Sequence, residues 1–133
     1  MKISASIKNE FNKHTVVVKT NDSAKEITIA PKSSGYGSSV NGAELLMLSL
    51  ATCFCNDIYR EAAKQNIKVS GVEVEFDSEF DKDGETGSNF QYKAKVLSDE
   101  PSEVIQELIV HTDRMAEIHN TLRKGVDIKL VKP

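Results

Sequence analysis

The two cysteines of this chain, Cys53 and Cys55, lie two residues apart in the middle of one apolar stretch. A cysteine thiolate is a strong nucleophile and can attack an electrophile such as a peroxide oxygen. On a helix, residues at i and i+2 point to nearly opposite sides, so these two should neither form a disulfide nor bind one metal together. The alternative interpretation is that both are buried and act as small hydrophobic residues.

A reactive Cys53 would need a nearby cation, because burial in the middle of a helix raises the pKa of a thiol. Arg60 lies seven residues further on, two turns along the same helix face. The other candidate cations are Arg114, Arg123 and Lys13. Sequence alone leaves the choice among them open.

Other side chains could support such a site. His111 and His119 are possible bases or ligands, although structural, hydrogen-bonded histidines are the more common alternative. Glu44 lies where the first turn of the helix should be, so its carboxylate is expected mainly to favour the helix dipole. No cluster of metal-ligating residues and no cofactor motif is evident, and we expect neither a metal nor a cofactor.

The stretch that carries the cysteines, residues 44–64, contains strong helix formers and no Gly or Pro. From residue 45 to 55 it is apolar or small on nearly every side, which is typical of a buried helix. This run is shorter than the roughly 20 apolar residues that span a bilayer. It therefore predicts the central helix of a core, with Asn41 as its N-cap.

The rest of the chain predicts strands and a second helix around this central helix. Alternating apolar residues predict three antiparallel strands at residues 3–7, 14–20 and 26–30, a hairpin of residues 68–80 and 90–96, and a last strand at 126–130. A one-sided apolar stripe predicts a second helix from Pro101 to Met115. Asn120 could cap a short helical turn at residues 121–124. The fold class is therefore α+β, with antiparallel sheets packed on the central helix and the second helix.

Composition limits the classes of function. A chain of 133 residues with 39% hydrophobic and 28% charged residues fits one domain, residues 1–133. The net charge of -3 gives no electrostatic reason to expect nucleic acid or a membrane as a partner. We see no signal peptide and no membrane span, so the cytoplasm is the expected location. A helix that is apolar all round needs more cover than one small domain supplies, which predicts an intertwined homodimer.

Two motifs, together with the order of elements, resemble the OsmC/Ohr family. They are residues 41–46 (NGAELL) leading to 51–54 (ATCF), and the ending at 120–126 (NTLRKGV). The resemblance implies a homodimeric α+β protein of a family whose best-known members reduce organic hydroperoxides with two cysteines. The cysteine that attacks the peroxide matches Cys53.

The remaining family residues are not retained in this chain. The resemblance puts the second, resolving cysteine at Ala116 and the helper glutamate at Ala43, one residue before Glu44. The helper arginine near the N-terminus has no clear counterpart, and Cys55 is additional. The chain therefore resembles a divergent branch that lacks the resolving cysteine.

Two hypotheses follow from this resemblance. In the first, Cys53 reduces organic hydroperoxides or related electrophiles in a stress response, supported by Glu44, Cys55, Arg60 or His119, and an external thiol restores it. In the second, the protein is a non-catalytic dimer that binds a small apolar molecule. The retained Cys53 favours the first hypothesis, and the missing resolving cysteine favours the second.

Overall fold

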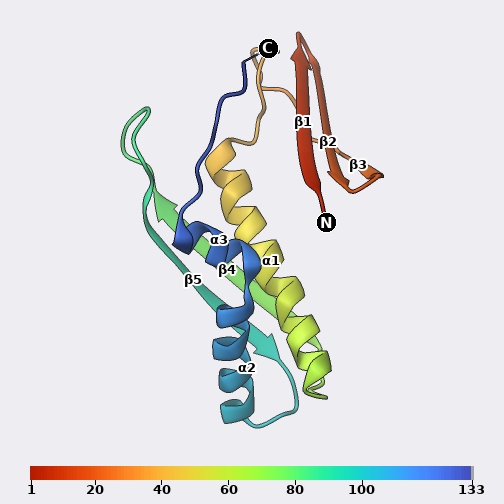
Figure 1. Ribbon diagram of the computed structural model, residues 1–133, viewed down its shortest axis with the longest axis vertical. Helices are drawn as coiled ribbons and strands as arrows, with labels where there is room; N and C mark the ends of the chain where they lie inside the picture. The colour runs from red at the N-terminus through yellow and green to blue at the C-terminus, as the bar shows by residue number, and fades with distance from the viewer. Residues whose placement is uncertain (133) are drawn as a thin grey trace. The chain divides into compact units, whose positions relative to one another are not determined.

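The computed structural model describes residues 1–132, which form five strands and three helices (Figure 1). In chain order these are β1 (Ile3–Glu10), β2 (Lys13–Thr20), β3 (Ser23–Ile27), α1 (Gly42–Lys64), β4 (Gly71–Glu79), β5 (Ser88–Leu97), α2 (Ser102–Met115) and α3 (Glu117–Lys124). The predicted α+β class and antiparallel sheets are confirmed. None of these helices is long and apolar enough to cross a membrane.

The chain divides into two compact units, residues 1–45 and residues 46 onward, and each is described by itself. The first contains an antiparallel sheet in the order β1-β2-β3, with Ile7 opposite Val16 and Val16 opposite Ile27. Two asparagines, Asn12 and Asn21, form the tight turns with positive φ angles of 53° and 52°. The predicted meander is confirmed, but β3 is shifted to Ser23–Ile27 from the predicted 26–30. That the whole chain behaves as a single domain stays a prediction.

A glycine-rich loop connects β3 to α1, and one glycine in it is sterically required. Gly35 has a φ of +86°, and a Cβ at this position would lie 2.4 Å from the ring of Phe11. The loop ends at a capping box, where the backbone N–H of Glu44 donates to Asn41 Oδ1 and that of Asn41 to Glu44 Oε2, both at 2.8 Å. The predicted N-cap is therefore confirmed.

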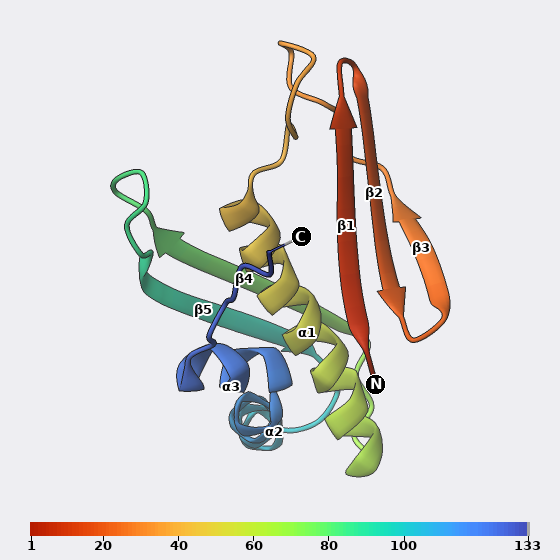
Figure 2. The same cartoon turned by 45° about the horizontal axis from the view of Figure 1, so that its top comes forward.

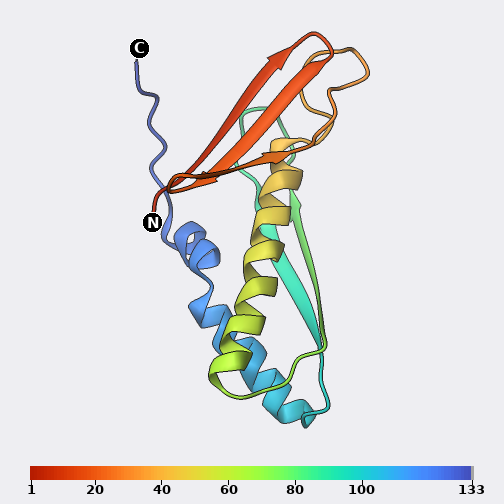
Figure 3. The same cartoon turned by 90° about the vertical axis from the view of Figure 1, so that its right-hand side faces the viewer.

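The second unit contains one antiparallel hairpin, β4-β5, with α1 and α2 on one of its faces (Figures 1 and 3). Its core consists of Phe54, Ile58, Ala62, Leu108 and Ala116, against which the inward-facing residues of the hairpin pack. The outward face carries the opposite-charge pairs predicted from the sequence, including Lys93 and Glu75 at 2.7 Å. Strand β4 is shorter than the predicted 68–80 and begins at Gly71.

The central helix α1 runs across the β4-β5 hairpin (Figure 2), and its buried residues lie along one stripe. Its buried residues recur at helical spacing: Leu50, Phe54, Asp57, Ile58, Glu61 and Ala62. Leu48 on another face is 61% exposed, so the single chain leaves part of this apolar helix uncovered, as expected from the sequence; that a second copy buries this face stays a prediction. One hairpin and one helix cover only part of a helix of 23 residues.

The C-terminal part differs most from the sequence-based prediction. Residues 125–132 do not form the predicted strand, and Ile128 and Leu130 are over nine-tenths exposed. A strand requires a neighbouring strand to bond, and this segment has none within residues 1–132. The predicted helical turn at 121–124 is instead part of α3, so Asn120 lies inside a helix and donates to the carbonyl oxygen of Arg114 at 2.9 Å.

Candidate functional site

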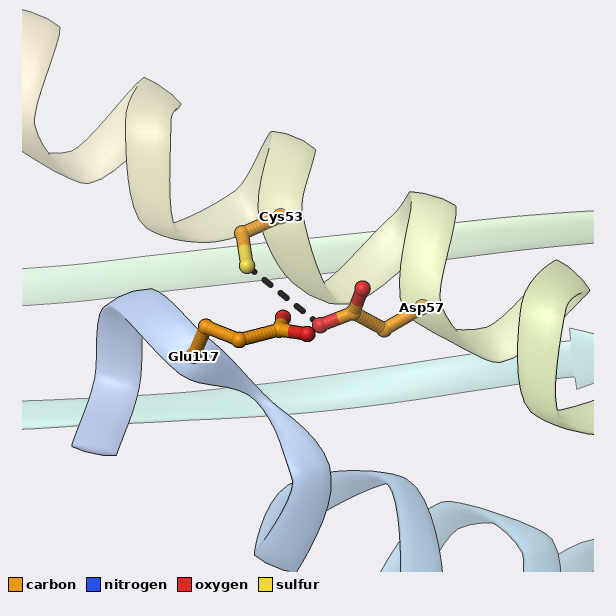
Figure 4. A group of neighbouring side chains, drawn as sticks. All are labelled: Cys53, Asp57 and Glu117. Carbon is orange, nitrogen blue, oxygen red and sulfur yellow. Dashed lines mark hydrogen bonds between the residues drawn. The ribbon is translucent and has the colours of Figure 1, made fainter. Parts of the chain in front are cut away.

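Cys53 lies in the middle of α1 beside two carboxylates (Figure 4). Its Sγ donates a hydrogen bond to Asp57 Oδ2 at 3.3 Å, because residues four apart face the same side of a helix. Glu117 approaches from the first turn of α3, and one ligand atom from each of the three residues lies within 4.8 Å of the others. Both cysteines are free and half-buried. Cys53 is therefore partly exposed, and its thiol lies beside two acidic groups.

This environment favours the protonated thiol. Burial is the largest effect and raises the pKa of Cys53, and the hydrogen bond to Asp57 and the charges of Asp57 and Glu117 raise it further. Only a hydrogen bond from the backbone of Ile118 acts in the opposite direction. The single chain thus provides little thiolate at neutral pH.

Arg60, the candidate cation on the same helix face, interacts with the carboxylates rather than with the sulfur. Its Nη1 lies 2.7 Å from Asp57 Oδ1 and 3.1 Å from Glu117 Oε1, and its Nε lies 2.8 Å from Glu61 Oε1. Among the four candidate cations, Arg60 is the one bound to Asp57, the carboxylate that contacts the Cys53 thiol. Its charge, however, stabilises the acidic residues around the thiol.

Asp57 itself is 4% exposed, which is unusual for an aspartate. Burial raises the pKa of its carboxyl most, and the charge of Glu117 adds to this effect. The hydrogen bond from Cys53 and the charge of Arg60 lower the pKa but do not cancel the increase. One oxygen of Asp57 therefore contacts the thiol while the other binds a guanidinium group.

A thiolate and two carboxylates could in principle bind a divalent metal. Here the guanidinium of Arg60 already lies against both Asp57 and Glu117 and supplies the positive charge that these carboxylates need. A metal ion would have to displace it. The arrangement is better explained as a hydrogen-bonded ionic group around a thiol.

The other predicted supporting residues lie apart from this group. Glu44 forms the capping box at the start of α1, in agreement with its structural interpretation. Cys55 is a half-buried free thiol that takes no part in the hydrogen bonds of Cys53. His111 is bound to Glu61, which Arg60 also binds, with Nε2 3.0 Å from Glu61 Oε2.

His119 is 4% exposed and packs inside the second unit. Its Nε2 donates to the carbonyl oxygen of Leu50 at 3.2 Å, and its ring stacks on Phe54 with an interplanar angle of 8°. These contacts support a structural histidine. The same ring also lines a cleft.

The cleft has a volume of about 600 Å³ and opens between the start of α1, the hairpin and α3. Most of its lining is apolar or aromatic: Leu46, Leu50, Phe76, Phe80, Phe90 and Tyr92. Arg123 is at one end, with Nη2 2.6 Å from Asp113 Oδ1, and Tyr92 donates to the same carboxylate. The lining residues identified in the described chain do not include Cys53, so the cleft and the thiol are separate features.

Asp57 and Glu117 were not among the site residues predicted from the sequence. The spacing of four residues between Cys53 and Asp57 is a helical signal that could have identified Asp57. Glu117 has no such signal, because it is 64 positions beyond Cys53 and reaches the site only through the packing of α3.

The sequence model of the family described as OsmC-like protein matches residues 35–131. No functionally curated protein gives a significant match. Among solved structures, an organic hydroperoxide resistance protein from Legionella pneumophila is 19% identical, with a TM-score of 0.62 and coverage of 97% of this chain and 94% of that one. Structural similarity at 19% identity shows that the two proteins share a fold.

Two further solved structures have the same fold as this chain. An OsmC-like protein from Mycoplasma pneumoniae is 17% identical, with a TM-score of 0.59 and coverage of 93% of this chain and 87% of that one. An organic hydroperoxide resistance protein from Vibrio cholerae, with captopril bound in one of its active sites, is 18% identical, with a TM-score of 0.61 and coverage of 96% and 88%.

Proposed function

The chain belongs to the family of OsmC-like proteins, and from that membership we propose that it reduces organic hydroperoxides with Cys53 as the nucleophile. The observation that carries the proposal is the half-buried Cys53, whose thiol is hydrogen-bonded to a buried carboxylate. Ionisable groups with perturbed pKa values cluster at functional sites, and Asp57 is a buried carboxylate in contact with this thiol. We propose that the activity belongs to a cytoplasmic stress response.

The proposed chemical step converts Cys53 to a sulfenic acid. The sulfur attacks the terminal peroxide oxygen, an S–O bond forms, the O–O bond breaks, and the alkoxide leaves as an alcohol after it receives the thiol proton. The sulfur is oxidised and the hydroperoxide is reduced by two electrons. An organic hydroperoxide is proposed as the substrate because the similar solved structures include organic hydroperoxide resistance proteins.

The sulfenic acid must be reduced by an external thiol. The position of the family's resolving cysteine is Ala116, a buried residue without a thiol, and Cys55 lies at i+2 on the helix. One external thiol forms a mixed disulfide with Cys53 and releases water, and a second restores the cysteine. A dithiol of the lipoyl type would carry out both steps.

We further propose that the working form is a homodimer. Leu48 on α1 and Ile128 and Leu130 in the C-terminal segment are large apolar side chains that the single chain leaves exposed. A second copy would bury them.

Stopped-flow measurement of thiol oxidation tests the enzymatic proposal. Reduced protein is mixed with cumene hydroperoxide or hydrogen peroxide, and turnover is followed with dithiothreitol or dihydrolipoamide as reductant. We expect faster oxidation by the organic hydroperoxide and complete loss in Cys53→Ser. Oxidation of Cys53 at the rate of an ordinary thiol would rule out the peroxidase.

A second candidate function is favoured by the apolar cleft, which is large enough for a small ligand. In this alternative the protein is a non-catalytic dimer that binds a small apolar molecule between the hairpin and α1. Leu50→Trp would fill the cleft. Two results together would favour the alternative: the wild-type protein binds an apolar ligand that Leu50→Trp no longer binds, and Cys53 does not react with the hydroperoxide.

A further inference from the structure

We propose that Asp57 is the catalytic base of the Cys53 reaction: it accepts the thiol proton as the sulfur attacks and returns it to the departing alkoxide. This inference rests on the proposed peroxidase function and adds a residue to it. The observation behind it is the contact between Cys53 Sγ and Asp57 Oδ2, a carboxylate held inside the protein next to the reacting atom.

A base next to Cys53 would allow the thiol to react although its acidic surroundings keep it protonated. A preformed thiolate needs a cation at the sulfur, but the guanidinium of Arg60 is bound to Asp57, Glu61 and Glu117. A thiol that stays protonated can still react if its proton leaves during the attack. Asp57 is the acceptor already in hydrogen-bond contact with it.

The geometry fixes Asp57 for this role. Its Oδ1 lies 2.7 Å from Arg60 Nη1, which leaves Oδ2 directed at the sulfur. Burial raises the pKa of the Asp57 carboxyl, which brings its affinity for a proton closer to that of the thiol. Arg60 is then a positioning residue, and Glu117 is the other charged group that faces this pair, from α3.

The proton balance of the step is complete. Asp57 gains the proton of Cys53 as the S–O bond forms and the O–O bond breaks, and the protonated carboxyl then donates to the alkoxide oxygen. The products are a sulfenic acid, an alcohol and the original carboxylate. No oxidant other than the hydroperoxide is consumed.

Two reactions of Cys53 distinguish this role from a purely electrostatic one. Alkylation by iodoacetamide depends on the thiolate, and its leaving group needs no proton. Reduction of a hydroperoxide needs removal of the thiol proton and delivery of a proton to the departing alkoxide. In Asp57→Asn, loss of the negative charge should increase the alkylation rate several-fold at neutral pH. The rate with cumene hydroperoxide should instead fall by about ten-fold or more.

Glu117→Gln is the matched control, because it removes a negative charge near the same sulfur but keeps Asp57. It should increase both rates. Asp81→Asn, on the exposed turn of the hairpin, should change neither. Circular dichroism checks that each variant is folded.

If Asp57→Asn does not fold, the wild-type protein provides the test. Proton transfer during the attack predicts that the hydroperoxide reaction slows in D₂O more than the alkylation does. Equal slowing of the two reactions overturns the role of Asp57, as does an Asp57→Asn variant in which both rates rise together. Wild-type protein whose Cys53 does not react with cumene hydroperoxide overturns the peroxidase itself.

Discussion

Replacing Glu61 by glutamine perturbs the ionic group that supports the Cys53 site. The side chain of Glu61 is 3% exposed and accepts hydrogen bonds from Arg60 Nε at 2.8 Å, Lys64 Nζ at 2.9 Å and His111 Nε2 at 3.0 Å. These three contacts, with Arg60 the largest effect, lower the pKa of the Glu61 carboxyl from 4.5 to about 2. A carboxylate paired in this way stabilises the folded state wherever it is ionised.

The size of the effect follows from the two pKa values. A carboxyl whose pKa falls from 4.5 in the unfolded chain to about 2 in the folded one contributes about 3 kcal/mol at neutral pH. Because the folded-state pKa is the lower one, this stability is present above the unfolded value and is lost as the pH falls from about 5 to about 2. Glu61→Gln should therefore cost about 3 kcal/mol at neutral pH, and almost nothing at the acid end.

Urea denaturation of the wild-type protein and Glu61→Gln across this pH range measures the difference. Protein concentration is held fixed, because association would change apparent stability. Glu107→Gln, an exposed change on α2, is the control and should stay within about 0.5 kcal/mol of wild type. A cost for Glu61→Gln that is the same at neutral and acid pH would refute the argument, as would a cost below about 0.5 kcal/mol at neutral pH.

Three further predictions concern the helix cap, the assembly and the second cysteine. Asn41→Ala removes one half of the capping box and should lower the free energy of unfolding by about 1 kcal/mol in the same urea assay; an unchanged value would contradict it. Sedimentation velocity at micromolar concentration should give a homodimer, and a folded monomer would argue against it. In mildly oxidised protein, a Cys53–Cys55 disulfide should not be the main product detected by mass spectrometry, and finding it as the main product would contradict the prediction.

Local patterns allowed much of the fold to be predicted. The central helix and its cap follow from residues that are neighbours in sequence. The β4-β5 hairpin was predictable for the same reason, because its strands are adjacent in the chain and complementary in charge.

The parts that could not be predicted depend on distant contacts. Alternation at residues 126–130 indicates a strand, but a strand forms only beside another strand, and residues 1–132 offer none to this segment. Glu117 likewise reaches Arg60 and Cys53 only because α3 packs against α1. The sequence therefore suggested a cation for the thiol, whereas Arg60 binds Asp57 and Glu61 of its own helix and Glu117 of α3.

The most direct test of the central claim is to identify the first oxidation product of the reduced protein. One equivalent of cumene hydroperoxide is added in the presence of dimedone, and the adducts are located by mass spectrometry. Because Ala116 occupies the position of a resolving cysteine, the sulfenic acid should accumulate on Cys53, disappear in Cys53→Ser and persist in Cys55→Ser. Slow and equal labelling of the two cysteines would contradict a Cys53-dependent peroxidase.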